Sequence, residues 1–291
     1  MVGLDPDPAR LWPQEPAALA GSRPAAAAEV AAHTAAAVAD HCRAVIDAVA
    51  GACVAVKLQL ACFERLGAPG WEALAATATI AHERELLVIA DGKRGDVPVT
   101  AAAYAQALVG ETPGPFGPVT GLGADAFTAS PLLGRESLEP MVAEARERGA
   151  GCFCLVRTSN AGAGELQDLP APRAPLHETL ARIVAELGAG LVGDSGLSAL
   201  GAVVGATRPG LLERLRELMP AAVFLLPGVG AQGGTVSELG AAFRPHPAAG
   251  LVAASRSIVG AHEERGGEPA VAAATAAEEL REAAWGLASG A

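Results

Sequence analysis

The sequence contains very little lysine. Of its 21 basic residues only two, Lys57 and Lys93, are lysines, and the other 19 are arginines. A chain that uses arginine for almost every cation keeps lysine where a compact ammonium must hold or release a proton. Lys57 ends a short apolar run, and Lys93 lies two residues after Asp91 and three before Asp96. A proton donor flanked by carboxylates at the end of a predicted strand indicates a catalytic site.

Long apolar runs and an excess of positive charge are also absent. No stretch of about 18 apolar residues predicts a membrane span, and the N-terminal residues resemble neither a signal peptide nor a transit peptide. The formal net charge is −11. This charge excludes a general surface for nucleic acid or anionic membranes, so neither is an expected partner. It is compatible with an anionic small molecule that a few local cations bind.

Cysteine and histidine show no metal-binding pattern. The five cysteines are odd in number, form no Cys-x-x-Cys pair and fall mostly on predicted core elements. They indicate a reducing environment, and we therefore expect a cytoplasmic protein. The six histidines are scattered without the spacing of metal ligands. We expect neither a metal nor a cofactor.

Short apolar runs alternate with helical patterns along all 291 residues. Apolar runs without polar alternation are typical of parallel strands that helices cover on both faces. Eight such βα units predict a (β/α)8 TIM barrel that forms a single domain over residues 1–291, and a doubly wound sheet is the alternative. The predicted strands cover residues 2–4, 52–57, 86–91, 124–129, 151–156, 202–206, 222–226 and 250–254. The predicted helices cover residues 25–49, 71–81, 99–108, 137–147, 176–187, 210–218, 237–243 and 269–287.

Polar motifs follow the predicted strands at their carboxyl ends, which is the face where barrel enzymes build active sites. The Gly/Pro-rich segments 110–123 and 159–173 are predicted to be loops or insertions. The motifs at the strand ends are Asp5, Lys57, the Asp91–Asp96 segment, Ser130, the segments 158–160 and 227–234, and Ser255 with Arg256.

Strand periodicity places Asp91 and Lys93 on one face, about 7 Å apart. Gly92 between them permits a turn or the close approach of a substrate. A solvated turn with surface ion pairs would have the same residues. Lys57 alone could be a strand-end lysine that reaches to solvent. Asp5 could initiate a turn or accept a hydrogen bond from a sugar hydroxyl.

The segment Gly228-Val-Gly-Ala-Gln-Gly matches the glycine pattern of dinucleotide-binding sites. Such a site needs an acidic residue about twenty positions later, and none lies between Glu238 and Glu263. A phosphate site built from the loops after strands seven and eight fits better, with Gln232 and Arg256 as side-chain donors. A simple glycine-rich turn is the alternative.

Taken in order, the motifs resemble the orotidine 5′-phosphate decarboxylase family, in particular its longer bacterial branch. The resemblance covers nearly the whole chain. Asp-x-Lys-x-x-Asp alone also occurs in related phosphosugar decarboxylases and aldolases, so the ordered set is the more specific signal. The motifs are Val2-Gly-Leu-Asp-Pro, Val56-Lys-Leu-Gln, Asp91-Gly-Lys-Arg-Gly-Asp, Asp125-Ala-Phe-Thr-Ala-Ser-Pro, Arg157-Thr-Ser-Asn, Val203-Val-Gly-Ala-Thr, Pro227-Gly-Val-Gly-Ala-Gln-Gly-Gly and Ser255-Arg-Ser-Ile.

The resemblance implies a cofactor-free lyase that converts orotidine 5′-phosphate to UMP and CO₂. Lys93 then protonates C6 of the pyrimidine, and Asp91 lies beside the departing CO₂. Lys57 orients Asp91 and touches the ribose, while Asp5 binds a ribose hydroxyl. Asp96 completes this Lys/Asp/Lys/Asp charge array.

The resemblance also implies a homodimer in which Asp96 and Thr100 enter the partner's site. Ser130 contacts the pyrimidine edge, and Pro227 lies at the substrate. Gln232 and Arg256 bind the phosphate.

The chain departs from the family pattern at a few positions. Pro98 and Val99 follow the central motif where small or polar residues are frequent, Leu58 replaces a frequent proline, and a helix usually precedes the first strand. Two alternatives stay open. One is a Mg²⁺-dependent phosphosugar decarboxylase or aldolase, which needs additional carboxylates; beyond the charge array, the strand ends after Lys57 and Ala129 have none. The other is a non-catalytic nucleotide-binding paralogue, although all four charged residues are present.

Overall fold

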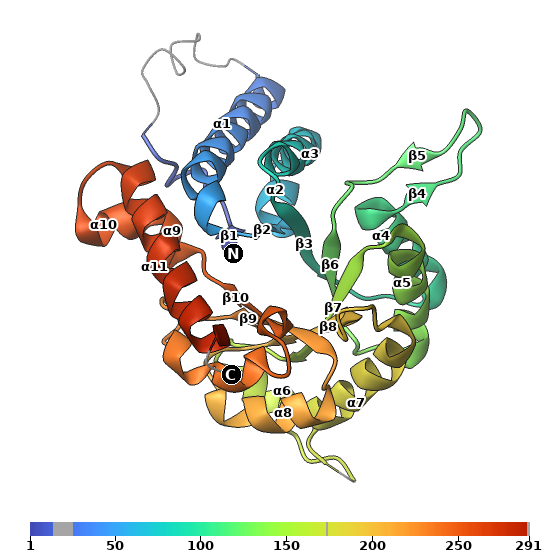
Figure 1. Cartoon of the computed structure of the whole chain (residues 1–291). Coiled ribbons are helices and arrows are strands. Elements are labelled where there is room, and N and C mark those ends of the chain that lie inside the picture. The colour runs from blue at the N-terminus through green and yellow to red at the C-terminus, as the bar shows by residue number, and fades with distance from the viewer. Residues whose placement is uncertain (14–25, 173, 290–291) are drawn as a thin grey trace. The chain divides into compact units, whose positions relative to one another are not determined.

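A computed structural model describes residues 1–13, 26–172 and 174–289 of the chain (Figure 1). Its main sheet has eight strands in the order β1-β2-β3-β6-β7-β8-β9-β10, and the pairs β1–β2, β2–β3, β6–β7, β7–β8, β8–β9 and β9–β10 are parallel. The order follows the chain without a reversal, whereas a doubly wound sheet reverses its order at a switch point. The (β/α)8 barrel prediction is therefore confirmed, and the doubly wound alternative is wrong.

All eight predicted strands are present, although several boundaries move by a few residues. Each strand is largely buried, as expected for strands with helices on the outer face. Two boundary changes matter for the site, because Lys57 and Asp91 lie within strands and not at their ends. The strands are β1 (Val2–Leu4), β2 (Ala55–Gln59), β3 (Leu87–Arg94), β6 (Ala126–Ala129), β7 (Gly151–Arg157), β8 (Ser198–Val204), β9 (Ala222–Pro227) and β10 (Gly250–Ala253).

Seven of the eight predicted helices are confirmed, with ends within three residues of their predicted positions over the described residues. Residue 25, the predicted start of the first helix, lies outside the described residues. The confirmed helices are α1 (Ala27–Val49), α3 (Ala68–Glu83), α4 (Pro98–Val109), α5 (Arg135–Arg148), α7 (Leu176–Gly188), α8 (Leu212–Leu218) and α11 (Pro269–Ser289). Four short α-helices among the described residues were not predicted, namely α2 (Leu60–Glu64), α6 (Ala163–Gln167), α9 (Arg256–Val259) and α10 (Ala261–Arg265).

The predicted helix over residues 237–243 is wrong. The chain forms two 3-10 helices there, η5 (Val236–Glu238) and η6 (Gly240–Phe243). The segment is too short for a stable α-helix, Gly240 lies at its centre, and Pro245 and Pro247 follow it closely. The connection from β9 to β10 is thus a series of tight turns.

The two segments predicted to be loops contain short regular elements. Within 110–123 a hairpin forms from β4 (Glu111–Thr112) and β5 (Val119–Thr120), which pair antiparallel. Within the described part of 159–173 lies the helix α6 (Ala163–Gln167), and residue 173 itself is outside the described residues.

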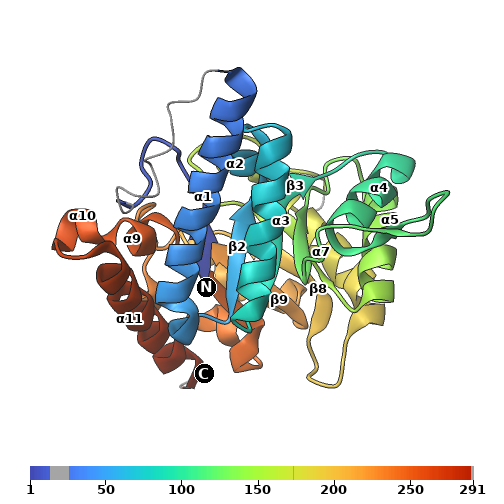
Figure 2. The ribbon, with the colours of Figure 1, turned by 90° about the horizontal axis from the view of Figure 1, so that it is seen from above.

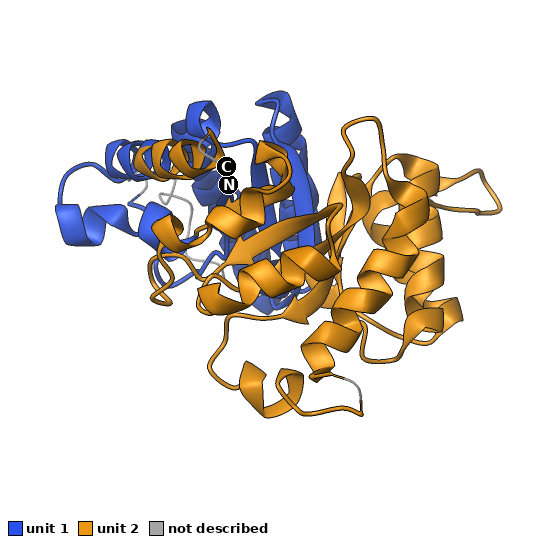
Figure 3. Cartoon of the chain, turned by 60° about the horizontal axis from the view of Figure 1, so that its bottom comes forward, with its two compact units in different colours: residues 1–91, 255–278 blue, residues 92–254, 279–291 orange. Residues whose placement is uncertain are grey.

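The chain divides into two compact units, whose boundaries fall within β3 and α11 (Figure 3). Unit 1 comprises residues 1–91 and 255–278, and unit 2 comprises residues 92–254 and 279–291. In unit 1, α1 and α3 lie side by side and cover β2 (Figure 2). Their buried faces carry mainly aliphatic side chains, among them Val38, Val45 and Ile46 of α1 and Leu74 of α3.

Unit 2 is built on the strands β6 to β10, with α4 packed on α5 and α7 packed on β7 and β8. Its core includes the fully buried Phe127 and Phe224.

All five cysteines of the chain lie in the described residues and are free thiols, and burial raises the pKa of Cys42 and of Cys152 to about 12. None of the helices among the described residues is long and apolar enough to cross a membrane.

Arg216 of α8 holds the connection between β9 and β10, which has no α-helix, in place. Its guanidinium is buried and stacks on the ring of Phe224 at 3.7 Å, and burial lowers the pKa of Arg216 to about 10. The five carbonyl oxygens that accept its hydrogen bonds belong to Met219, Pro220, Ala222, Ala242 and Ala249. One side chain thus satisfies backbone groups that a regular helix would have paired internally.

Replacing Arg216 by Met should strongly destabilise the protein. Because several buried carbonyls would lose their donor, the free energy of unfolding should fall by about 3 kcal/mol or more in urea denaturation. Arg244→Met is the matched control, since Arg244 forms only an exposed ion pair with Glu213 and its loss should cost less than about 1 kcal/mol. Equal effects of the two variants would contradict the role assigned to Arg216.

Candidate active site

Unit 1 contains a cluster of three charged residues, two of them buried. The Nζ of Lys57 donates to Oδ2 of Asp91 at 2.6 Å and lies 3.7 Å from Oδ1 of Asp5. The side chains of Lys57 and Asp91 are only 11% and 5% exposed, while that of Asp5 is 39% exposed. Lys57 therefore links one fully buried carboxylate to one at the surface.

The strand register explains how these side chains meet. Lys57 is the central residue of β2 and lies opposite Ile89 of β3, two residues before Asp91. The offset is about 7 Å along the strand, which the four-carbon stem of lysine can span. The sequence analysis placed Lys57 at a strand end, and the structure corrects this because β2 continues to Gln59. A charge in the middle of a buried strand is more costly than one at its end and needs a partner.

Electrostatics keep Lys57 charged. Burial alone lowers the pKa of an ammonium, but here the negative charges of Asp91 and then of Asp5 outweigh that effect and raise the pKa of Lys57 above 10.5. Lys57 is thus charged at neutral pH, and the stabilisation that its charge provides is lost as the pH rises through the raised pKa.

At the end of β3 the backbone leaves the regular strand conformation. Lys93 has a φ of +48°, which is rare for a residue with a side chain and is often found at functional sites. Its backbone N–H donates to Oγ1 of the buried Thr128 at 2.8 Å. The two-residue strand periodicity that placed Asp91 and Lys93 on one face does not apply across such a residue, so that part of the sequence argument is corrected.

The neighbouring residues hold this turn against β6. The backbone N–H of Ser130 donates to the carbonyl of Arg94 at 2.7 Å. A side chain at Gly95 would collide with the carbonyl oxygen of Ser130, because a Cβ built there lies 2.8 Å from it. Ser130 thus contacts the predicted catalytic segment through its backbone.

Asp96 and Thr100 lie at the beginning of α4. Asp96 accepts a hydrogen bond from the backbone N–H of Val97 at 2.8 Å, and Pro98 occupies the first turn of the helix, where proline is well tolerated. Thr100 is exposed, as are the apolar side chains of Val97 and Val99.

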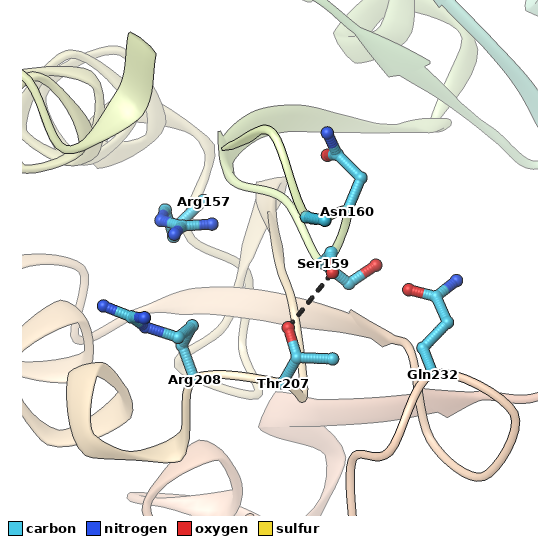
Figure 4. A pocket seen from close by; sticks show the side chains of 7 residues that line it. Arg157, Ser159, Asn160, Thr207, Arg208 and Gln232 are labelled. Atoms are coloured by element: carbon cyan, nitrogen blue, oxygen red, sulfur yellow. Dashed lines mark hydrogen bonds between the residues drawn. The ribbon is translucent and has the colours of Figure 1, made fainter. Parts of the chain in front are cut away.

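A pocket of about 530 Å³ opens in unit 2 at the carboxyl ends of β7, β8 and β9 (Figure 4). Figure 4 shows two arginines on one side of it, Gln232 on the opposite side and Ser159 between them. The hydroxyl of Thr207 donates to the carbonyl of Ser159 at 3.2 Å. Gly228 has a φ of +100° and lies close to Ser159. A Cβ added to Gly228 would lie only 2.9 Å from the Cβ of Ser159. The pocket is lined by Arg157, Ser159, Asn160, Ala161, Thr207, Arg208 and Gln232.

Charge in this pocket is only partly balanced. Arg157 is buried and forms two hydrogen bonds with Asp168, at 2.8 and 3.0 Å, which hold the pKa of Asp168 below its usual range. Arg208 lies 3.9 Å from the same carboxylate, and its side chain is 58% exposed. Two guanidinium groups thus share one neighbouring carboxylate, and the surplus positive charge favours an anionic ligand.

The structure brings some predicted site residues together and leaves others apart. Asp5, Lys57 and Asp91 form one cluster, and Gln232 lines the pocket of unit 2. Pro227 is the last residue of β9, and Arg256 is an exposed residue at the start of α9.

Sequence analysis missed several residues that line the pocket. Ser159 and Asn160 were part of the motif Arg157-Thr-Ser-Asn, and Thr207 ended the motif Val203-Val-Gly-Ala-Thr, but none of them was assigned a role. Arg208 was not singled out at all. The position of Thr207 and Arg208 shortly after β8 was the signal that could have identified them.

Comparison with known proteins places the chain in a family. The model of the "Orotidine 5'-phosphate decarboxylase / HUMPS family" matches residues 1–267. The chain belongs to this family.

Curated relatives support the assignment. The orotidine 5′-phosphate decarboxylase of Rhodopirellula baltica is 45% identical over 219 residues, which are 75% of this chain and 72% of that protein. That of Roseiflexus castenholzii is 37% identical over 287 residues, covering 97% of this chain and 90% of that protein. The resemblance seen in the sequence motifs is therefore confirmed.

Solved structures of orotidine 5′-phosphate decarboxylases share the fold. The chain matches the OMP decarboxylase of Leishmania donovani with a TM-score of 0.72 at 29% identity, covering 99% of this chain and 92% of that one. It matches a putative orotidine 5′-phosphate decarboxylase from Streptomyces avermitilis with a TM-score of 0.72 at 34% identity, covering 88% and 84% of the two chains.

Replacing Lys57 by Met should destabilise the protein, because the buried carboxylate of Asp91 would lose its cation. We expect the free energy of unfolding at pH 7 to fall by about 3–5 kcal/mol in urea denaturation. Asp5→Asn is the control: its partly exposed carboxylate lies 3.7 Å from Lys57, so we expect a change below about 1 kcal/mol. A Lys57→Met variant as stable as the control would show that the pair contributes nothing net.

Proposed function

We propose that this protein decarboxylates orotidine 5′-phosphate to UMP and CO₂, the last step of de novo pyrimidine biosynthesis. The observation that carries the proposal is the cluster of Asp5 with the buried pair of Lys57 and Asp91, in a chain of the decarboxylase family. The strand that carries Asp91 continues to Lys93. A structural ion pair alone would not explain why the only two lysines of the chain belong to the adjacent strands β2 and β3.

In this proposal Lys93 donates the proton. Loss of CO₂ leaves a carbanion at C6 of the pyrimidine, and a preorganised ammonium stabilises that charge and then protonates the carbon. The left-handed backbone of Lys93, which Thr128 supports through its hydroxyl, fixes where the side chain begins. Asp91 lies beside the departing carboxylate, and Lys57 keeps Asp91 ionised and oriented.

The remaining residues bind the nucleotide. Asp5 is suited to a ribose hydroxyl, since it is a partly exposed carboxylate held next to Lys57. Gln232 and Arg256 bind the phosphate, and Ser130 and Pro227 contact the pyrimidine side. Ser159 joins this group in our proposal, because it lines the same pocket as Gln232.

We further propose a homodimer in which Asp96 and Thr100 reach the partner's site. Val97 and Val99, which lie between these two residues in the sequence, are 54% and 85% exposed. Apolar side chains beside a functional carboxylate are the kind of surface that a second subunit covers. The proposal also includes a single barrel domain over residues 1–291, a cytoplasmic location and catalysis without metal or cofactor.

The two alternatives receive less support. The curated relatives at 37–45% identity are orotidine 5′-phosphate decarboxylases. Among the described residues no group of three or more His, Cys, Asp and Glu side chains is arranged to hold a metal ion. A non-catalytic paralogue would be expected to lack a member of the charge array, and the four residues Lys57, Asp91, Lys93 and Asp96 are all present.

The function is tested by following the decay of orotidylate ultraviolet absorbance with purified protein, with and without a chelator. Activity should be equal in both conditions, and Lys93→Ala should abolish it. Lys93→Arg should rescue little, because guanidinium does not release a proton near neutral pH. Strict dependence on Mg²⁺ would favour the phosphosugar branch, and an active Arg variant would contradict the role of Lys93 as proton donor.

The shared site is tested by mixing two inactive variants, Lys93→Ala and Asp96→Ala. If Asp96 serves the neighbouring subunit, one site of each heterodimer receives both wild-type groups, and some activity should return. Subunit exchange is verified with differently tagged chains. Exchange without any recovery would mean that Asp96 acts within its own chain.

A further inference from the structure

The segment that follows β1 is fastened to another part of unit 1 by a tryptophan. It begins with Asp5, which lies beside Lys57, and further along it carries Trp12, only 7% exposed. The indole Nε1 donates to the carbonyl of Val259 at 2.9 Å. Val259 is the last residue of α9, the helix that begins with Arg256. One side chain therefore connects the segment that carries Asp5 with the helix that carries Arg256.

A residue of α1, His41, in turn holds Trp12 in place. Its backbone N–H donates to Nδ1 of His41 at 3.1 Å, and the two rings meet edge to face with centroids 5.5 Å apart. Burial, and then the nearby His262, lowers the pKa of His41 to about 4. The imidazole is thus neutral near pH 7 and Nδ1 can accept this hydrogen bond. His262 of α10 lies edge-on to the indole at 6.4 Å, so Trp12 is packed between two histidines.

The short segment between Asp5 and Trp12 is stiff. Pro6 and Pro8 restrict its backbone, and the N–H of Arg10 donates to the carbonyl of Asp7 at 2.8 Å to close a turn. Next to Asp5, the carbonyl of Pro6 accepts a hydrogen bond from Nη2 of Arg65 at 2.6 Å. A displacement at one end of such a segment is transmitted to the other end instead of being absorbed in between.

We propose that Trp12 is a positioning residue for the reaction, because its hydrogen bonds to His41 and Val259 hold Asp5 and Arg256 in a fixed relation. The inference rests on the proposed function, in which Asp5 binds a ribose hydroxyl and Arg256 binds the phosphate. A nucleotide 5′-phosphate engages both ends at once, and it gains the full benefit only if both are already in place. A ligand without the phosphate touches the Asp5 end alone and does not depend on the connection.

A tryptophan that only fills the core would behave differently. Its removal would change the stability of the protein and would affect turnover of every substrate alike. The positioning role instead predicts a loss that depends on the phosphate, and this difference makes the inference testable.

The first experiment compares Trp12→Phe with the wild type on two substrates, orotidine 5′-phosphate and orotidine. Phenylalanine retains an aromatic ring but has no N–H for Val259. We expect kcat/KM for the phosphorylated substrate to fall about tenfold, as for one lost buried hydrogen bond, and kcat/KM for orotidine to change less than about twofold. Trp71→Phe on α3, where the tryptophan is 42% exposed, is the matched control and should change neither value. Equal losses on both substrates, or no loss on either, would overturn the inference.

The second experiment replaces His41 by Asn and by Leu. The side-chain oxygen of Asn can still accept the hydrogen bond from the backbone of Trp12, whereas Leu offers no acceptor. We expect His41→Asn to retain most of the activity on orotidine 5′-phosphate and His41→Leu to show the phosphate-dependent loss of Trp12→Phe. If the two variants behave alike, His41 acts by packing and the inference fails. A wild-type protein without activity on orotidine 5′-phosphate would instead contradict the proposed function itself.

Discussion

The interaction on which the rest of the site depends is the buried ion pair of Lys57 and Asp91. Taking both charges out of water costs several kcal/mol per ion, and only a short, well-aligned contact offsets that cost. The contact is 2.6 Å long and joins adjacent strands, so the alignment of β2 and β3 must be maintained for the pair to form. Asp5, whose side chain is partly exposed, is the member of the cluster that contacts solvent.

The backbone is strained at the end of β3, the strand that also carries Asp91. Beyond Asp91 the chain turns sharply enough that Lys93 adopts a left-handed backbone, and Thr128 satisfies its N–H. Such a conformation costs of order 1 kcal/mol or more and persists only where the surroundings impose it. The strand before it and the hydrogen bonds to β6 within unit 2 supply those surroundings. The proposed proton donor is thus positioned by the backbone geometry at the end of β3.

Two buried side chains donate hydrogen bonds to backbone carbonyls that regular helices would satisfy elsewhere in the fold. Arg216 donates to the carbonyls of Ala242 and Ala249 in the connection before β10, and Trp12 fastens the segment after β1 to α9. Both do so by donating to backbone oxygens, which need a partner wherever secondary structure ends. The loops that carry proposed binding residues can then be irregular without being loosely held.

The sequence by itself determined the eight βα units and the family, because apolar runs and helical periods are local patterns and the motifs are ordered along the chain. It also singled out both lysines, since their rarity marks them. Only the tertiary structure decided that Lys57 lies in mid-strand opposite Ile89, that Lys93 breaks the strand period, and that Ser159 and Arg208 meet in one pocket. The helix predicted over residues 237–243 failed partly for a local reason, because Gly240 at its centre and the prolines that follow disfavour an α-helix. The carbonyl of Ala242 pairs instead with the side chain of Arg216, and long-range pairing of that kind leaves no local pattern in the sequence.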